Sequence, residues 1–70
     1  MPLRNRSFSL SGHRTSVALE NEFWAVLERA AKEDGKSLSA FVAAIDRRRG
    51  ARPLASALRL TALEAAARPS

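Results

Sequence analysis

The N-terminal part of the chain alternates between apolar and polar residues, a pattern typical of half-buried β-strands. In residues 6–10, Phe8 and Leu10 alternate with serines, and a Ser-Gly pair at 11–12 interrupts the pattern. Glycine readily adopts the positive φ that a tight turn requires. The alternation resumes over residues 14–19, which we expect to form a strand. Residues 6–10 form either a second strand, paired with it as a hairpin, or a flexible arm.

The strand predicted at 14–19 has two chemically different faces. Its more apolar face consists of Thr15, Val17 and Leu19, and its opposite face of Arg14, Ser16 and Ala18. Successive side chains of a strand point to opposite sides, so the first set is expected in a core and the second in solvent. Even a hairpin is marginally stable alone in water. We therefore expect this strand to need a partner, which a second copy of the chain would supply.

A first amphipathic helix is predicted over residues 20–34. Its apolar positions share one helical face, because they recur at spacings of three and four: Phe23, Leu27, Ala30 and Ala31, with Trp24 extending the face. Glu20, Asn21 and Glu22 place acids and a good capping residue at its start. Gly35 is a natural stop after its end.

A second amphipathic helix is predicted from Ser37 to about Arg49. Its apolar stripe comprises Leu38, Phe41, Val42 and Ile45. Ser37 is the expected N-cap, to which Ser39 would add. The arginines at 47–49 suit the C-terminal end of the helix dipole, and we expect a solvated face there more than a DNA contact. Gly50 ends the helix.

A third helix is predicted after Pro53, in a stretch rich in alanine and leucine. One face would carry Leu54, Ala57, Leu58 and Ala62, with Leu60 and Leu63 widening it and Pro69 ending the helix. The segment has few charges, so we expect it to pack against other parts of the protein.

The length of 70 residues allows a single domain, whose core alone supplies only about 3–5 kcal/mol. The chain has no cysteine and one histidine, His13, so neither disulfides nor a usual zinc site can compensate. We expect no cofactor and no metal. Oligomerisation is the remaining means of stabilisation.

The formal net charge of +5 makes nucleic acid the first candidate partner, the alternative being a basic protein without such a partner. No apolar run approaches the roughly 20 residues of a membrane span, and no secretory signal is recognised. We therefore expect a cytoplasmic protein. The sequence contains no cysteine nucleophile, paired-carboxylate site or Gly-rich phosphate loop, and it is not expected to be an enzyme.

A basic alternating strand, a helix, a Gly-containing turn with serines and a second helix follow one another in this chain. The segments that carry this order are residues 14–19, the helix with Phe23 and Leu27, and the turn at 35–40. Together they resemble the ribbon-helix-helix family of bacterial DNA-binding repressors. Residues 11–17 and the stretch 53–63 resemble in particular a short bacterial subfamily of mostly unassigned role. The resemblance covers about residues 6–65.

This resemblance implies a mainly α fold with a short β-ribbon, built as an intertwined homodimer with an additional C-terminal helix. It divides the chain into a basic N-terminal arm or extra strand at 1–12, a ribbon-helix-helix core at 13–50, and a C-terminal helix and tail at 51–70. The predicted dimer core comprises Thr15, Val17, Leu19, Phe23, Trp24, Leu27, Phe41, Val42 and Ile45.

The resemblance also implies how the dimer would bind double-stranded DNA. The ribbon would enter the major groove with Arg14, Ser16 and Ala18 facing the bases; alanine departs from the polar residues usual in the family. Phosphate contacts are expected from Arg4, Arg6, His13, Lys36, Ser37, Leu38 and Ser39. The predicted function is a sequence-specific transcriptional repressor. The alternative is an antitoxin-like interaction module whose segment 53–66 binds a partner protein.

Overall fold

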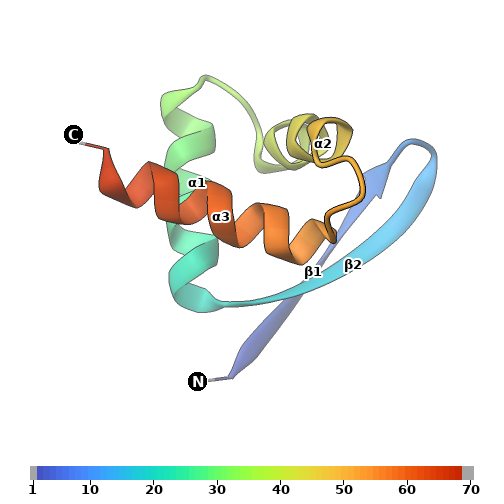
Figure 1. The fold of residues 1–70 in the computed structure, drawn as a ribbon, viewed down its shortest axis with the longest axis horizontal. Coiled ribbons are helices and arrows are strands. Elements are labelled where there is room, and N and C mark those ends of the chain that lie inside the picture. The colour runs from blue at the N-terminus through green and yellow to red at the C-terminus, as the bar shows by residue number, and fades with distance from the viewer. Residues whose placement is uncertain (1, 69–70) are drawn as a thin grey trace.

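A β-hairpin followed by three helices makes up the fold (Figure 1). The computed structural model describes residues 2–68. The elements are β1 (Leu3–Leu10), β2 (His13–Glu20), α1 (Asn21–Glu33), α2 (Leu38–Arg48) and α3 (Leu54–Ala67). The predicted ribbon followed by helices is thus confirmed, and the dimer stays a prediction. The part of the predicted tail that begins at Pro69 lies outside the described residues, as does Met1.

The two strands form an antiparallel sheet joined by a two-residue loop. Leu10 faces His13 across the loop, and the pairing continues without a break to Leu3 opposite Glu20. Both loop residues have positive φ, 51° at Ser11 and 80° at Gly12, which is the backbone of a type I′ hairpin turn. Residues 3–10 are therefore a strand here, and this strand begins earlier than the alternation at 6–10 indicated.

The hairpin buries one face and exposes the other. Val17 and Leu19 of β2 are buried together with Phe8 and Leu10 of β1, while Thr15 is half-buried on the same side. β1 thus gives β2 a strand partner within the chain. The pairing that the strand needs, which we expect from a second copy on sequence grounds, is supplied by the same chain.

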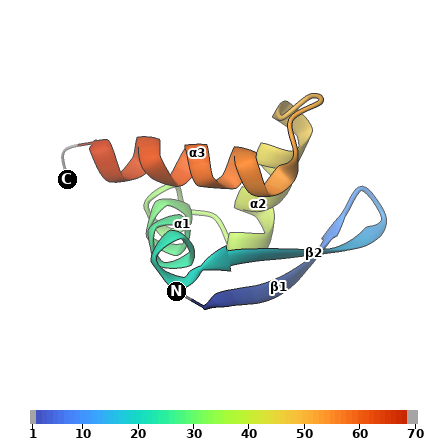
Figure 2. The ribbon, with the colours of Figure 1, turned by 60° about the horizontal axis from the view of Figure 1, so that its bottom comes forward.

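The molecule is layered, with the ribbon on one side, α1 and α2 in the middle and α3 on the other side (Figure 2). A single core connects the layers; its largest fully buried side chains are Trp24, Leu19, Leu27, Leu58 and Val42. The helix α3 contributes Leu54, Ala57, Leu58 and Ala62 to this core, as its predicted apolar face required. No helix in residues 2–68 has the length and apolar character needed to cross a membrane.

Trp24 fastens β1 to α1. Its indole Nε1–H donates a hydrogen bond of 2.8 Å to the backbone carbonyl of Arg4, and its ring lies 5.9 Å from that of Phe8. The Arg6 guanidinium lies 5.1 Å from the centroid of the same ring and forms an ion pair of 2.8 Å with Glu28 of α1. The contacts of the Arg6 side chain explain why an arginine occurs on a face whose neighbouring residues are buried, whereas Arg4 contributes its backbone carbonyl and its side chain is exposed.

The helix ends differ in part from the prediction. Ser37 caps α2 as expected, because its hydroxyl accepts a hydrogen bond of 3.1 Å from the backbone N–H of Ala40. At the start of α1, however, Asn21 is already helical, and the N-cap is Glu20, which makes no side-chain capping bond. The Glu20 carboxylate is turned instead toward Arg59 of α3, at 3.2 Å.

Candidate nucleic-acid interface

The outward face of the hairpin is mainly polar. Arg14, Ser16 and Ala18 lie on it, the first two exposed and the third half-buried. The register pairs them with Ser9, Ser7 and Asn5 of β1, all exposed. One cross-strand side-chain hydrogen bond lies on this surface, between the hydroxyl groups of Ser7 and Ser16, whose oxygens are 3.0 Å apart.

Arg14 is the positively charged side chain of β2 on this face. It is exposed and makes no ion pair with the residues that the structure describes. Its guanidinium presents five donors in a planar fork, which match the two acceptors that guanine shows in the major groove. Ser16 both donates and accepts hydrogen bonds, whereas Ala18 offers only a methyl group.

The start of α2 lies beside the ribbon, and the helix rises away from it toward the α3 side (Figure 2). The positive end of its dipole is therefore on the ribbon side of the molecule. Because the N–H of Ala40 is taken by Ser37, the first-turn amides available to an anion are those of Leu38 and Ser39. Lys36 lies next to them, and its Nζ is 3.2 Å from a carboxylate oxygen of Asp34.

The other predicted phosphate ligands differ in their position on the hairpin and in their exposure. Arg4 and Arg6 face Leu19 and Val17 across the hairpin, so both start from the inner side of the ribbon. Arg6 is half-buried and held by Glu28 and Trp24, whereas Arg4 is exposed. His13 is exposed at the hairpin end of β2. A phosphate contact from Arg6 would require it to release Glu28.

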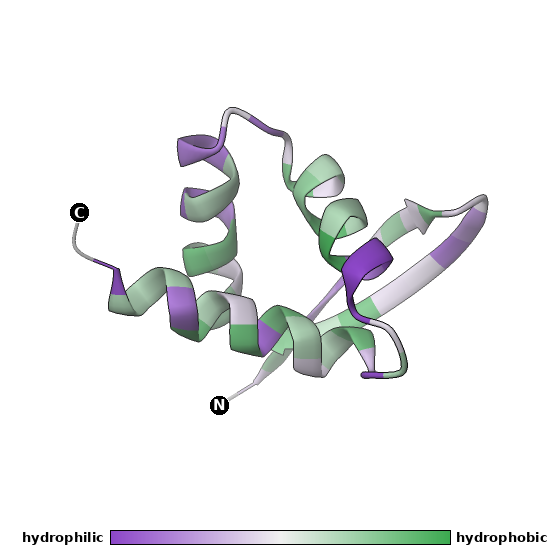
Figure 3. Ribbon diagram, turned by 45° about the horizontal axis from the view of Figure 1, so that its top comes forward, coloured by the Kyte–Doolittle hydropathy of each residue, from purple (hydrophilic) through white to green (hydrophobic). Residues whose placement is uncertain are grey.

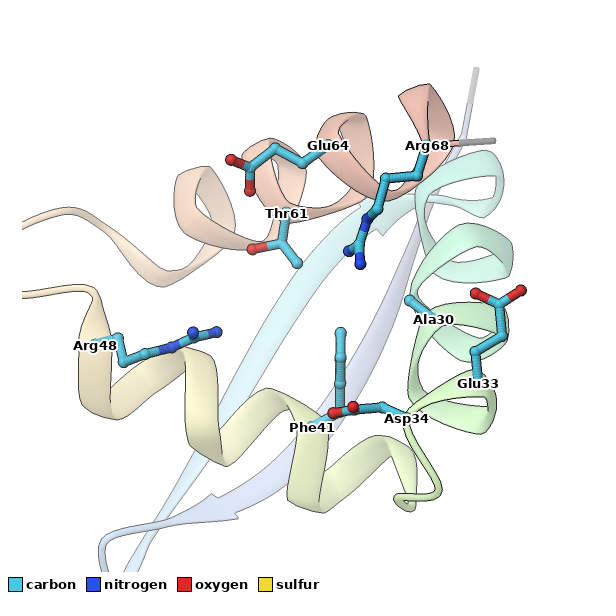
Figure 4. Close-up of a pocket in the computed structure, with 8 residues that line it drawn as sticks. All are labelled: Ala30, Glu33, Asp34, Phe41, Arg48, Thr61, Glu64 and Arg68. Atoms are coloured by element: carbon cyan, nitrogen blue, oxygen red, sulfur yellow. The ribbon is translucent and has the colours of Figure 1, made fainter. Parts of the chain in front are cut away.

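Apart from Thr15, the residues predicted for a dimer core lie in or against the core of a single chain. Val17, Leu19, Trp24, Leu27, Val42 and Ile45 are buried, while Thr15, Phe23 and Phe41 are half-buried. Phe41 points into a hollow between the three helices, which Arg48 and Arg68 also line (Figure 4). Of the predicted core aromatics, Phe23 and Phe41 are thus the two that retain exposed surface.

Sequence reasoning missed the contribution of Asn5, Ser7 and Ser9 to the outward face. The available signal was the alternation at 6–10 followed by Ser-Gly, which is a hairpin signature. Since a two-residue loop fixes the register, the serines of this stretch had to lie opposite Ser16 and Arg14 if the hairpin formed.

Comparison with known proteins adds one match. A family model described as a ribbon-helix-helix domain matches residues 3–66, which includes both strands and nearly all of the three helices. No curated protein and no solved structure matches the chain. The matched segment begins with β1, so the hairpin as a whole falls within the family's domain.

Proposed function

This chain belongs to the ribbon-helix-helix family, a family of DNA-binding regulators, and we propose that it is a sequence-specific transcriptional repressor acting as a homodimer on double-stranded DNA. The observation that carries the proposal is the two-faced hairpin. One face of β2 is sealed into the core, and the other holds Arg14, Ser16 and Ala18 in register toward solvent.

In this proposal the outward face of β2 reads base edges in the major groove. The groove is about 12 Å wide and admits a two-stranded ribbon. Arg14 would bind O6 and N7 of a guanine, a contact worth about 1–3 kcal/mol of discrimination. Ser16 would contribute a weakly selective hydrogen bond, and the Ala18 methyl would contact the methyl of a thymine.

The dimer would form along the open edge of β2. One edge of β2 is paired with β1, and the other has no strand beside it in the two-stranded sheet. Because the pair Leu10 and His13 closes a two-residue loop, hydrogen-bonded pairs alternate from there. The backbone groups of Arg14, Ser16 and Ala18 consequently point to the open edge, where β2 of a second copy would pair antiparallel.

Such a dimer has a four-stranded sheet in which the two β2 strands are central. With strands about 4.8 Å apart, the outer strand axes are about 14 Å apart, more than the groove admits. The β1 strands would therefore lie over the phosphate walls, where Asn5, Ser7 and Ser9 suit phosphate oxygens. The amides of Leu38 and Ser39 would bind a further phosphate. Remaining phosphate contacts are proposed for Arg4, Arg6, His13, Lys36 and Ser37.

The alternative, an antitoxin-like module, requires segment 53–66 to bind a partner protein. A segment that becomes ordered only on a partner would lack a place in the core of the free chain. Here α3 is folded onto α1, α2 and β2 and buries Leu54 and Leu58. The observations therefore favour the DNA-binding proposal.

The test is selection of binding sites from a random pool of DNA duplexes, using the wild type and Arg14→Ala in parallel. We expect the wild type to enrich a symmetric motif containing guanine, and Arg14→Ala to lose the preference at that guanine by roughly 10- to 100-fold. The matched control is Arg29→Ala, which removes an equal charge from an exposed position on α1.

The outcomes separate clearly. If Arg29→Ala enriches the wild-type motif and Arg14→Ala does not, the base-reading role of Arg14 is supported. A wild type that enriches no motif would overturn sequence-specific recognition. If Arg14→Ala enriched the wild-type motif unchanged, Arg14 would not be the residue that recognises the guanine.

A further inference from the structure

The outward side of α3 carries an apolar stripe that residues 2–68 leave uncovered. Leu60 is 41% exposed and Leu63 is 57% exposed, while the opposite side of the helix is buried in the core. The exposed Ala67 extends the stripe at one end, and Ser56, a small polar residue that is half-buried, occupies the equivalent position at the other, giving successive spacings of four, three and four residues. Figure 3 shows α3 as mainly hydrophobic, interrupted by short hydrophilic bands. This is the spacing of the seam in a two-helix coiled coil.

Charges of opposite sign lie on the two flanks of this stripe. Arg59 lies on the flank toward β2 and α1, where it contacts Glu20 at 3.2 Å and lies 5.8 Å from the ring of Phe23. Glu64 lies on the other flank, along the groove between α3 and α2, which Arg48 also lines. The side chain of Arg59 remains 37% exposed. Within residues 2–68, no cation lies within ion-pair distance of Glu64.

We propose that this stripe is an interface with a second copy of the chain, in which two α3 helices pack side by side in parallel. In a parallel pair the seam residues Leu60 and Leu63 meet their equivalents, and one flank of each helix meets the opposite flank of its mate. Arg59 and Glu64 are five residues apart, so Arg59 of each copy faces Glu64 of the other. Two reciprocal ion pairs then close the seam.

Charge complementarity between the two flanks favours a second copy of the chain as the partner, and it favours a parallel orientation of the two α3 helices. An antiparallel pair would bring equal flanks together and set Arg59 against Arg59, which is unfavourable. The stripe is short, so the association is expected to be weak and to depend on concentration. Because α3 and the ribbon lie on opposite sides of the molecule (Figure 2), the pair would leave both ribbons exposed. The interface is therefore separate from the open edge of β2 and could join two DNA-binding units.

The experiment is sedimentation equilibrium of the full chain over a wide concentration range, without DNA. We expect the weight-average mass of the wild type to rise with concentration above that of Leu63→Glu, toward twice its value at the highest concentration. The matched control is Ala25→Glu, which places the same charge on an exposed position of α1 and should behave as the wild type. This excess over the mass of Leu63→Glu is expected whether that variant is a monomer or a dimer, so it does not depend on the proposed β2 pairing.

The direction of the helices is tested with Glu64→Arg, an exposed substitution that leaves the core intact. A parallel pair of this variant would set two arginine side chains against each other on each flank, and the mass should fall to that of Leu63→Glu. Mixing Glu64→Arg with Arg59→Glu should restore the wild-type mass, because both flanks become complementary again. Glu33→Arg on α1 is the matched control. Circular dichroism verifies that each variant is folded.

Several results would overturn the proposal. A wild-type mass that does not rise with concentration, or that equals the mass of Leu63→Glu throughout, would show that the stripe does not bind a second copy. An equal loss in Ala25→Glu would attribute the effect to net charge. A Glu64→Arg variant that associates like the wild type would exclude the parallel arrangement.

Discussion

Trp24 shows how much a single side chain contributes to holding the hairpin against the helices. Its ring is buried between β1 and α1, and its one polar atom is satisfied by the Arg4 carbonyl at 2.8 Å. Replacing it by phenylalanine keeps an aromatic ring but removes this hydrogen bond and part of the buried ring. We expect Trp24→Phe to lower the free energy of unfolding by about 1–3 kcal/mol, measured by urea unfolding followed by circular dichroism.

The nearby ion pair provides a contrast at the same scale. Glu28→Gln removes the partner of Arg6 but leaves the indole hydrogen bond intact. Since the Glu28 side chain is half exposed, we expect a loss below about 1 kcal/mol. If Glu28→Gln were the more destabilising of the two variants, the account of Trp24 as the main anchor of β1 would be wrong.

At the scale of elements, the sequence predicts those whose pattern is local. The strand at 14–19 and the helices follow from alternation and from spacings of three and four, and all are present within a few residues of the expected bounds. The beginning of β1 could not be predicted from alternation of apolar and polar residues. Arg4 and Arg6 stand at its inner positions and interrupt the apolar pattern. The Arg6 side chain is accommodated there by Trp24 and Glu28, which are distant in sequence, and the exposed Arg4 contributes a backbone carbonyl to Trp24.

The strand that pairs with β2 also cannot be predicted from the local sequence pattern. A strand edge offers the same backbone donors and acceptors to any other strand, so the residues of β2 do not specify whether β1 or a second copy pairs with them. The candidate site is similar: the outward position of Arg14 follows from alternation, whereas the addition of Asn5, Ser7 and Ser9 depends on the hairpin register.

The contact between the end of β2 and α3 makes a prediction for pH. The pKa of Glu20 is lowered from its ordinary value of 4.5, first by its own backbone N–H and then by the hydrogen bond from Arg59, against partial desolvation. A group with a depressed folded-state pKa stabilises the fold above its unfolded-state pKa and loses this contribution as pH falls through the folded value. Glu20→Gln should therefore be less stable than the wild type at neutral pH, and the difference should shrink below pH 4.5.

Unfolding free energies of both proteins between about pH 3 and pH 7 measure this effect. Arg59→Gln should be measured alongside, because it removes one cause of the lowered pKa of Glu20 and leaves the backbone N–H of Glu20 in place. It should reduce the pH dependence without abolishing it. Stability curves of the wild type and Glu20→Gln that run parallel over the whole range would contradict the assignment.

At the scale of the whole molecule, the proposed dimer raises the question of which edge of the hairpin would join the two copies. Ser16 and Ser7 are directly opposite each other, in the pair whose backbone groups point away from the hairpin, to the open edges of β2 and β1 respectively. Proline lacks the backbone N–H and is tolerated on edge strands. Ser16→Pro and Ser7→Pro therefore each remove one outward donor, and both lose the same hydroxyl contact.

If the copies pair through β2, Ser16→Pro should reduce the mass measured at low concentration from that of a dimer to that of a monomer. Ser7→Pro should leave this mass unchanged. Sedimentation in the Leu63→Glu background isolates this step from any association through α3. The opposite result, with Ser7→Pro alone dissociating the protein, would assign the interface to β1. In that case β1 would be central in the groove, and base reading would pass from Arg14 and Ser16 to Asn5, Ser7 and Ser9.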